Sequence, residues 1–141
     1  MPQKVEVHKV TAPADLERTF AIRYEVFVVE QGCPPELEHD LEDESVHFLA
    51  SVDEIPAGAC RWRKTDKGYK LERFAVLNKF RGFGVGQEMV KVVLSDLPKD
   101  ADYVYLHAQT PAVTLYQRFN FEKLGLEFEE AGIKHFKMVR K

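Results

Sequence analysis

The sequence predicts an α/β fold in which a mixed sheet of about seven strands carries helices on both faces. The first observation is a strand pattern at residues 69–76, which leads through a glycine-rich turn into an amphipathic helix pattern at residues 85–97. The second is a run of shorter strand patterns before that unit, joined by tight turns. Tight turns join antiparallel strands, whereas a strand–helix–strand crossover makes a parallel pair, so the sheet should contain both kinds.

The first part of the chain predicts one strand and one helix. Alternation at residues 5–10 indicates a strand, and Thr11 and Pro13 suit the cap and the first turn of a helix. The run at residues 32–35, Gly-Cys-Pro-Pro, ends that helix because glycine and proline do not continue it. Five apolar residues of the helix fall on one face: Leu16, Phe20, Tyr24, Phe27 and Val28.

The remaining elements follow from alternation and from turn residues. Strands are predicted at residues 46–52, 57–63, 69–76, 103–108, 121–126 and 134–140, and helices at residues 85–97 and 111–119. Pro98 ends the first of these helices. Asn120 follows the second, where we expect it to take the left-handed conformation that glycine usually supplies.

The turn between the strand and the helix alternates glycine with other residues: Arg81, Gly82, Phe83, Gly84, Val85 and Gly86. The first N–H groups of a helix have no internal partner, and glycines let the backbone approach phosphate oxygens. The spacing differs from the G-x-G-x-x-G of dinucleotide folds, and Gln87 stands where a P-loop needs lysine. The turn therefore predicts a phosphate site of another kind, and a plain glycine-rich turn is the alternative.

Composition narrows the class of protein. The 141 residues suggest a single domain, residues 1–141, and the net charge of −3 argues against nucleic-acid binding. No apolar run reaches the roughly 18 residues of a membrane span, and no signal-peptide pattern is visible. Two cysteines, Cys33 and Cys60, are too few for a disulfide framework. We therefore expect a cytoplasmic protein without membrane or nucleic-acid partners.

An acidic segment, residues 36–44, contains six carboxylates, with His39 inside it and His47 just after it. The simplest interpretation is a solvated loop. The functional alternative is a rim whose negative charge attracts a cationic amine. A metal site is disfavoured because no compact His or Cys/His spacing accompanies the carboxylates, and no metal is expected.

The glycine turn resembles the R/Q-x-x-G-x-G/A turn of the GNAT (Gcn5-related) N-acetyltransferases, and the predicted order of elements is the GNAT order. Residues 23–31 resemble the R-x-x-V-F-V-x-E-Q signature of the branch called ElaA-like or YjcF-like. Further similarities to that branch are Glu38, Asp40, Asp43 and His47; His107-Ala108-Gln109 with Tyr116 and Phe121; and residues 132–135 with Met138. Asn120 departs from the usual glycine, which affects a helix cap and leaves the chemistry untouched.

The resemblance implies a GNAT fold, acetyl-CoA as co-substrate and transfer of its acetyl group to an amine. It places the pantetheine arm along the backbone of Phe74, Ala75 and Val76, with the thioester oxygen near the Val76 N–H. It places the pyrophosphate on residues 81–86, with Gln109 and Tyr116 completing the cofactor site.

Acetyl transfer needs a base for the amine and a proton for the departing thiolate. Tyr116 is the candidate acid, and a packing role for its ring is the alternative. Glu72 is the candidate base, because it lies four residues before Val76 and on the same strand face by alternation; an exposed strand charge is the alternative. Other candidates are Glu30, Asp40 and His47, assigned to the acceptor side, and His107 and His135.

The predicted function is transfer of an acetyl group from acetyl-CoA to the primary amine of a small, cationic acceptor. Aminosugars, polyamines, amino acids, antibiotics and peptide amines all remain open. The alternative is a non-catalytic acetyl-CoA-binding sensor or scaffold, which the glycine turn would serve equally well. Strand edges near the C-terminus make a homodimer a further, generic possibility.

Overall fold

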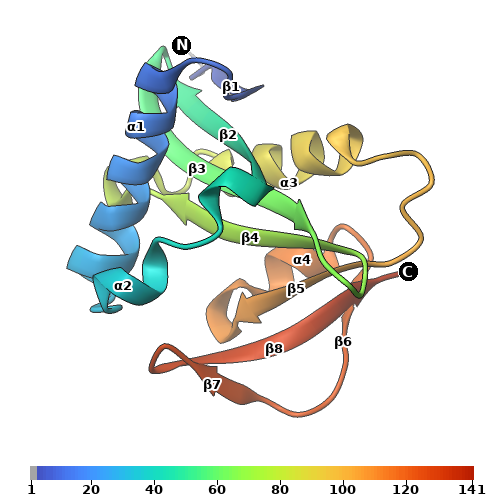
Figure 1. The fold of residues 1–141 in the computed structure, drawn as a ribbon. Helices are drawn as coiled ribbons and strands as arrows, with labels where there is room; N and C mark the ends of the chain where they lie inside the picture. Colours follow the sequence, from blue (N-terminus) through green and yellow to red (C-terminus); the bar gives the residue numbers. More distant parts are fainter. Residues whose placement is uncertain (1–2) are drawn as a thin grey trace.

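The structure is a computed structural model that describes residues 3–141 as one eight-stranded sheet with helices around it (Figure 1). The strands are β1 (Val5–Lys9), β2 (Ser45–Val52), β3 (Ile55–Lys64), β4 (Tyr69–Val76), β5 (Val104–Gln109), β6 (Phe121–Lys123), β7 (Phe128–Glu130) and β8 (Ile133–Arg140). The α-helices are α1 (Pro13–Arg23), α2 (Pro35–Glu38), α3 (Val85–Asp96) and α4 (Val113–Gln117). A π-helix, η1 (Tyr24–Glu30), and three 3₁₀ turns, η2 (Glu42–Glu44), η3 (Asn78–Phe80) and η4 (Thr110–Ala112), complete the chain.

The sheet is mixed, as the sequence predicts. Its strand order is β1-β2-β3-β4-β5-β8-β6, and β7 also pairs with β8. Strands β4 and β5 run parallel because α3 crosses over between them, and the other pairings are antiparallel. The predicted α/β fold of about seven strands is confirmed, and the short β7 is the additional strand.

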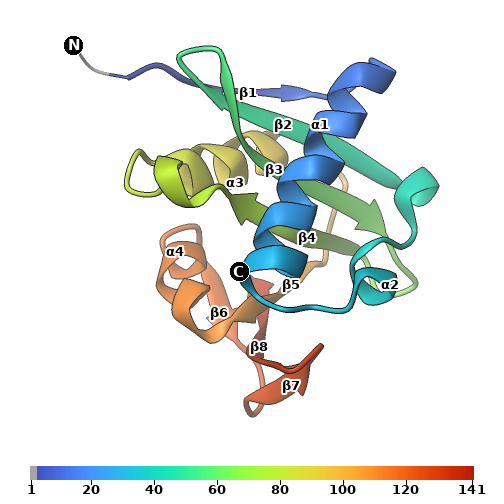
Figure 2. The same ribbon diagram turned by 90° about the vertical axis from the view of Figure 1, so that its left-hand side faces the viewer.

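Helices cover both faces of the sheet, and each face has its own apolar core (Figure 2). On one face α1 lies across β2, β3 and β4, and the core there consists of Ile22, Val26, Leu49, Ala59 and Ala75. On the other face α3 packs over a larger cluster that includes Phe48, Leu71, Val85, Met89 and Val93. Phe48 and Leu49 are consecutive yet belong to different cores, because side chains alternate along a strand.

Strand β3 and helix α3 approach closely at Gly58. A Cβ at this position would lie 3.0 Å from the Ala75 carbonyl oxygen and 3.0 Å from a Val85 methyl carbon. Glycine therefore lets the first turn of α3 sit directly on the sheet beside the end of β4. None of the helices described within residues 3–141 combines the length and the apolar character that a membrane span requires.

Several elements differ from the predicted ones: the helix predicted at residues 111–119 is the turn η4 followed by the short α4, and α2 begins just before the segment predicted as a loop and extends into it. The first helix was predicted as regular through Val28, but it widens into the π-helix η1, in which Gln31 N–H donates to the Val26 carbonyl five residues earlier at 3.1 Å. The strand predicted at residues 121–126 ends at Lys123, because Gly125 has a φ of +87° and breaks the extended backbone before β7. Asn120 has a φ of +70° and takes the predicted left-handed conformation.

Candidate active site

The sheet opens where β4 and β5 separate. Their parallel pairing lasts only three residue pairs and ends at Leu71 and Leu106. Beyond this point the strands enclose a cleft with a volume of about 480 Å³. One part of its lining, with Phe74 and Tyr116, belongs to the α3 face of the sheet, and another part, with Phe27, belongs to the α1 face. The cleft is therefore lined by residues from both faces of the sheet.

A β-bulge shapes the β4 wall of this cleft. Arg73 has a φ of +58°, and the register between β3 and β4 shifts between Ala59 and Arg61. The extra residue reverses the alternation, so Glu72 faces the α1 side whereas Val76 packs with the α3 core. The prediction that Glu72 and Val76 share a strand face is therefore wrong. Its physical reason is the left-handed residue between them, which strict alternation does not allow for.

The end of β4 presents backbone groups to the cleft. Leu77 N–H donates to the Ala57 carbonyl at 2.9 Å, so the groups of Leu77 point toward β3 and those of Val76 point the opposite way. The Val76 carbonyl already accepts from Arg81, at 2.9 Å from Nη2 and 3.1 Å from Nε. The prediction of a pantetheine arm pairing with both groups of Val76 is therefore corrected: its N–H alone is free for that role.

The glycine turn ends in an open helix N-terminus. Gly82 and Gly84 have φ values of +91° and +80°, and Gly84 is the N-cap of α3 without a side-chain capping bond. A Cβ on either glycine would touch nothing within 4 Å, so conformation, and not crowding, requires glycine there. The first N–H groups of α3 consequently face outward without an internal partner, as an anion site needs.

Arg81 does not reach into this anion site with its side chain. Its guanidinium group forms a bidentate pair with Glu30, at 2.6 and 2.7 Å, besides its bonds to the Val76 carbonyl. These hydrogen bonds hold the pKa of the Glu30 carboxyl below its ordinary value. The assignment of Glu30 to the acceptor is thus corrected, because its carboxylate joins η1 to the end of β4. Arg81 contributes its backbone to the glycine turn, and its side chain connects η1 to the end of β4.

Tyr116 lines the cleft from α4, as the sequence suggests. Its ring meets Phe74 and Phe121 edge-on, with centroids 5.9 and 6.1 Å away. Burial, with a smaller effect from the Cys60 thiol, raises the pKa of its phenol well above the ordinary value. The phenol is therefore protonated throughout the neutral range and can act as a hydrogen-bond donor.

Gln109, predicted at the cofactor, is bonded across the cleft instead. Its side-chain amide and that of Gln31 donate to each other, at 2.9 and 3.2 Å. This amide pair joins the turn after η1 to the end of β5, and both residues line the cleft. Gln109 thus bridges the two walls, and its remaining N–H is available to a ligand.

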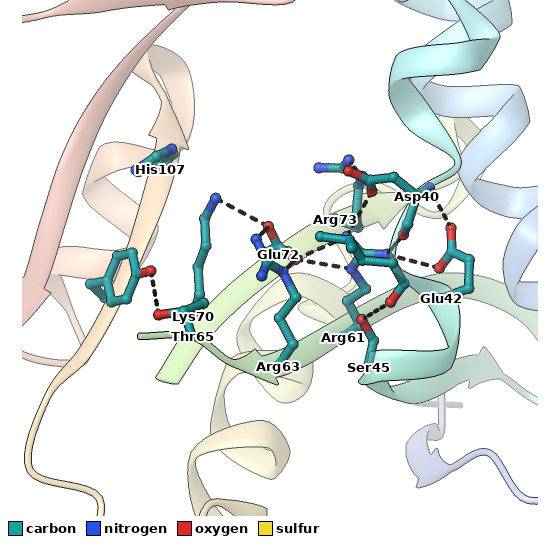
Figure 3. Close-up of polar contacts among 12 residues, drawn as sticks. Asp40, Glu42, Ser45, Arg61, Arg63, Thr65, Lys70, Glu72, Arg73 and His107 are labelled. Atoms are coloured by element: carbon teal, nitrogen blue, oxygen red, sulfur yellow. Dashed lines mark hydrogen bonds and ion pairs between the residues drawn. The ribbon is translucent and has the colours of Figure 1, made fainter. Parts of the chain in front are cut away.

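The acidic segment is an ion-pair network and not an open acidic rim (Figure 3). Arg61, fully buried, donates to Glu72 at 2.9 and 3.1 Å and to Glu42 at 2.8 Å. It also reaches Asp40, through the carboxylate at 3.0 Å and the carbonyl at 2.6 Å. Arg23, equally buried, donates to Glu38 at 2.6 Å and to Glu42 at 2.7 and 2.9 Å. The predicted attraction of a cation by this segment is therefore weakened, since three of its six carboxylates are already neutralised.

Glu72 is a poor proton acceptor in this environment. Besides Arg61, it accepts from Arg63 Nε at 2.7 Å and lies 3.1 Å from Lys70 Nζ. Burial alone would raise the pKa of its carboxyl, but the hydrogen bond from Arg63 and the charges of Arg61 and Lys70 lower it to about 2. A general base works best with a pKa near the operating pH, so this geometry argues against Glu72 as the base.

The two remaining acceptor-side residues differ in position. Asp40 lines the cleft but is bonded to Arg61 and Arg73, at 3.0 and 2.9 Å. His47 is buried against Phe20, its Nε2 lies 3.0 Å from the Glu42 carbonyl, and burial lowers its pKa. His47 does not line the cleft, so its assignment to the acceptor is corrected to a structural one.

The structure adds a pair that the sequence did not single out, His107 with Glu130. His107 Nδ1 lies 3.1 Å from a Glu130 oxygen, and both residues line the cleft opposite Glu72 and Lys70. The hydrogen bond to His107 lowers the pKa of the Glu130 carboxyl. Because a carboxylate only accepts, a neutral His107 carries its proton on Nδ1 and leaves the Nε2 lone pair free. His107 was one of several candidate bases, whereas Glu130 carried no motif. The turn at Ala131 and Gly132, with φ values of +53° and +79°, brings Glu130 back over β5.

His135 also lines the cleft but is fixed by its neighbours. Its Nδ1 lies 2.7 Å from the Ile133 carbonyl, and its ring stacks on Phe128 at 5.9 Å. The described part of the chain brings together no group of three or more His, Cys, Asp or Glu side chains suited to a metal ion.

A mixed sheet that splays after β4, with an uncapped glycine turn at the end of that strand, defines the acyl-CoA N-acyltransferase fold. Residues 5–141 match the family described as "Acetyltransferase (GNAT) domain", and the chain belongs to this family. It is 43% identical over 129 residues to the uncharacterized N-acetyltransferase YjcF of Bacillus subtilis strain 168, with 89% of this chain and 91% of YjcF covered. It is 30% identical over 145 residues to protein ElaA of Escherichia coli K12, covering 94% and 92% of the two chains.

Solved structures agree with this assignment. The crystal structure of Escherichia coli ElaA superposes with a TM-score of 0.83 at 27% identity, covering 98% of this chain and all of the other. A Bacillus subtilis acetyltransferase in complex with CoA shares the fold with a TM-score of 0.69 at 15% identity, over 97% and 98% of the two chains. The ElaA-like and YjcF-like branch proposed from the sequence motifs is thereby confirmed.

The charge network predicts how stability depends on pH. The pKa of Glu72 is about 2 in the folded state against an ordinary 4.5, so its stabilisation is complete above 4.5 and is lost as the pH falls toward 2. We expect Glu72→Gln to lower the free energy of unfolding by about 3 kcal/mol near neutral pH, and this deficit to shrink by about 2 kcal/mol near pH 3. Urea denaturation of the variant and of the unchanged protein at both pH values measures this difference in the free energy of unfolding. Glu36→Gln, an exposed carboxylate, is the control, and a deficit for Glu72→Gln that does not change with pH contradicts the analysis.

Proposed function

We propose that this protein transfers the acetyl group of acetyl-CoA directly to the primary amine of a small acceptor. The observation that carries the proposal is the free backbone edge of β4, which leads from the cleft straight to the uncapped N-terminus of α3. An extended arm ending in a pyrophosphate suits such an edge and such a terminus. Membership of the GNAT family supports acyl transfer in general, and the choice of acetyl donor and of amine is our proposal.

The residues of the chain hold the co-substrate through their backbone. The N–H groups of Phe74 and Val76 take the pantetheine arm, and that of Val76 also polarises the thioester carbonyl as negative charge develops on its oxygen. The N–H groups of residues 82–86 bind the pyrophosphate. Acetyl-CoA supplies the activated acyl group, and the protein supplies orientation and proton transfer.

His107 is the proposed base and Tyr116 the proposed acid. The Nε2 of His107 takes a proton from the acceptor ammonium, while Glu130 keeps the ring in the required tautomer. The amine nitrogen then forms its bond to the acetyl carbon, the carbon–sulfur bond breaks with its electron pair leaving on sulfur, and the nitrogen gives up its second proton, which the thiolate takes up to form the CoA thiol. Tyr116 donates a hydrogen bond to that sulfur. Because burial makes the phenol a weaker acid, it stabilises the developing thiolate more than it transfers a proton outright.

A non-catalytic acetyl-CoA sensor remains the competing function, and the glycine turn alone serves it equally well. A histidine–carboxylate pair facing the cleft favours the enzyme, because a sensor needs no base there. Release of free CoA thiol, followed with a thiol reagent over a panel of amines, separates the two. Binding of acetyl-CoA without thiol release from any amine would establish the sensor.

The first prediction concerns the glycine turn. Gly84→Asp places a carboxylate where the pyrophosphate binds, whereas Gly84→Asn has the same shape without the charge, and both residues tolerate a left-handed φ. We expect the affinity for acetyl-CoA, measured by calorimetry, to be at least about tenfold weaker for the Asp variant than for the Asn variant. Equal affinities in two folded variants would remove the pyrophosphate from this turn.

The second prediction concerns Tyr116. Tyr116→Phe keeps the ring and its packing but removes the hydrogen-bond donor, so kcat should fall by about 10²-fold or more while acetyl-CoA affinity is retained. A donor with a better leaving thiol should restore part of the rate. Tyr105→Phe is the control, because Tyr105 is a buried tyrosine bonded to Thr65 outside the cleft lining. An unchanged kcat in folded Tyr116→Phe would leave that ring a packing role only.

The third prediction concerns His107. His107→Gln should lower kcat/KM by about 10²-fold or more, and added imidazole should restore part of it by supplying the missing base. Raising the pH should also reduce the difference in kcat/KM between His107→Gln and the unchanged protein. More of the acceptor is then free amine, because the pKa of an alkylammonium group is about 10.4. His8→Gln, on the exposed strand β1, is the control. A deficit that neither imidazole nor high pH relieves would assign His107 a structural role.

A further inference from the structure

The β3 and β4 wall of the cleft carries three cations that are only partly buried. The side chains of Arg63, Lys70 and Arg73 line the cleft and are 19%, 15% and 22% exposed. Behind them lie the buried Arg23 and Arg61. This wall faces His107 across the opening between β4 and β5, and Figure 3 shows Lys70 extending toward the side of the cleft that His107 occupies.

Each carboxylate on this wall is paired with at least one cation, and Glu72 is paired through both of its oxygens. Glu72 accepts from Arg61 and Arg63 on one oxygen, and its other oxygen meets Arg63 at 3.3 Å and Lys70 at 3.1 Å. Asp40 accepts from two guanidinium groups through a single oxygen, and Glu38 accepts from Arg23. An incoming ammonium group would therefore have to displace an existing ion pair to reach Glu72, and at Asp40 it would meet a carboxylate that already lies beside two guanidinium groups.

The cations, in contrast, keep unused donors. Within residues 3–141, Arg63 bonds through Nε and Nη2 and Arg73 through Nε and Nη2, so the Nη1 group of each has no partner. Lys70 Nζ has Glu72 as its single close partner, whereas an ammonium group offers three donors. Free donors at the cleft surface suit a ligand that brings acceptor oxygens.

The charge balance points the same way. Five cations, Arg23, Arg61, Arg63, Lys70 and Arg73, meet four carboxylates, Glu38, Asp40, Glu42 and Glu72, so this wall holds one positive charge in excess. Glu130 lies on the opposite wall, where it is bonded to His107 and also feels the charge of Lys70. The other carboxylates of the acidic segment, Glu36, Asp43 and Glu44, are exposed and do not line the cleft. A partly buried wall that carries an excess of cations is stabilised by a bound anion.

We infer that the acceptor carries a carboxylate as well as its amine, as an amino acid does. The inference rests on the proposed function and identifies its acceptor class. Arg63 and Lys70 bind the carboxylate, and the positive charge of Arg73 strengthens the attraction. The amine lies at His107 on the opposite wall. Lys70 pairs with Tyr105, two residues before His107, so the two binding groups come from adjacent strands at the start of the split. Apolar lining from Leu37, Leu106 and Ile133 favours an apolar side chain on the acceptor.

Direct binding tests this inference independently of turnover. The probes are L-phenylalanine and 2-phenylethylamine, which differ only by the carboxylate, with L-leucine and isopentylamine as a second pair. Calorimetry with CoA present should show each amino acid binding at least about tenfold more tightly than its amine, since a charge-assisted pair is lost in the latter. If neither pair shows this preference, the inference is overturned, whatever the thiol-release assay reports.

Variants locate the contact. Arg63→Gln and, separately, Lys70→Met should each reduce the preference for the amino acid by about tenfold without changing the affinity for the bare amine. Lys64→Gln is the matched control, since Lys64 is an exposed cation on the same strand as Arg63 and does not line the cleft. A preference that survives in both folded variants would also overturn the assignment of the carboxylate to this wall. Absence of thiol release with every amine, in contrast, would reject the proposed transferase and leave the binding result standing.

Discussion

Two buried guanidinium groups, those of Arg23 and Arg61, determine how the α1 side of this molecule is assembled. A buried charge is tolerated only when it is paired and hydrogen-bonded, so each guanidinium group must be paired with carboxylates from other elements of the fold. Arg61 on β3 gathers Glu72 from β4 and Glu42 from η2, and Arg23 at the end of α1 gathers Glu38 and Glu42. Glu42 bridges both guanidinium groups. The end of α1 and the segment that carries α2 and η2 are thereby held against the sheet by charge.

The cleft depends on two irregular backbone segments, one in β4 and one after α1. The bulge at Arg73 turns the edge of β4 outward, and the π-helix η1 inserts an extra residue into the first helix. Their ends are tied together by Arg81, which holds both Glu30 of η1 and the Val76 carbonyl of β4. Departures from regular structure of this kind cost free energy, and they persist here because several polar contacts enforce them. The site is thus built where the regular pairing of the sheet fails.

Alternation and turn residues were enough to predict the mixed sheet, its helices and the left-handed Asn120, because these depend on local pattern. The glycine turn was also predicted, because the positive φ values at Gly82 and Gly84 favour glycine, and glycines are visible in the sequence. The side chains of the site were predicted less accurately than the fold. A β-bulge at a non-glycine residue such as Arg73 cannot be recognised from the sequence, so Glu72 was placed on the wrong face of β4. The structural roles of Glu30 and His47 could not be predicted from the sequence. The partner of Glu30, Arg81, lies far away along the chain, and the partner of His47 is a backbone carbonyl, that of Glu42. Glu130 was missed because only the hairpin after β7 brings it to His107.

The electrostatic character of the acceptor site shows most clearly what spacing alone leaves out. Six carboxylates in nine residues suggested a surface for cations, yet a count along the chain does not say which charges are already paired. Arginines from α1, β3 and β4 reach this segment from distant parts of the sequence and neutralise Glu38, Asp40 and Glu42. Glu72 joins Arg61 and Arg63 of β3 to β4, the strand that offers its backbone to the co-substrate, so both halves of the site depend on the same pair of strands. Arg63 and Lys70 sit at the exposed margin of that pair of strands, where a substitution changes the charge offered to the acceptor while Arg61 still holds Glu72 and the shape of β4 in place.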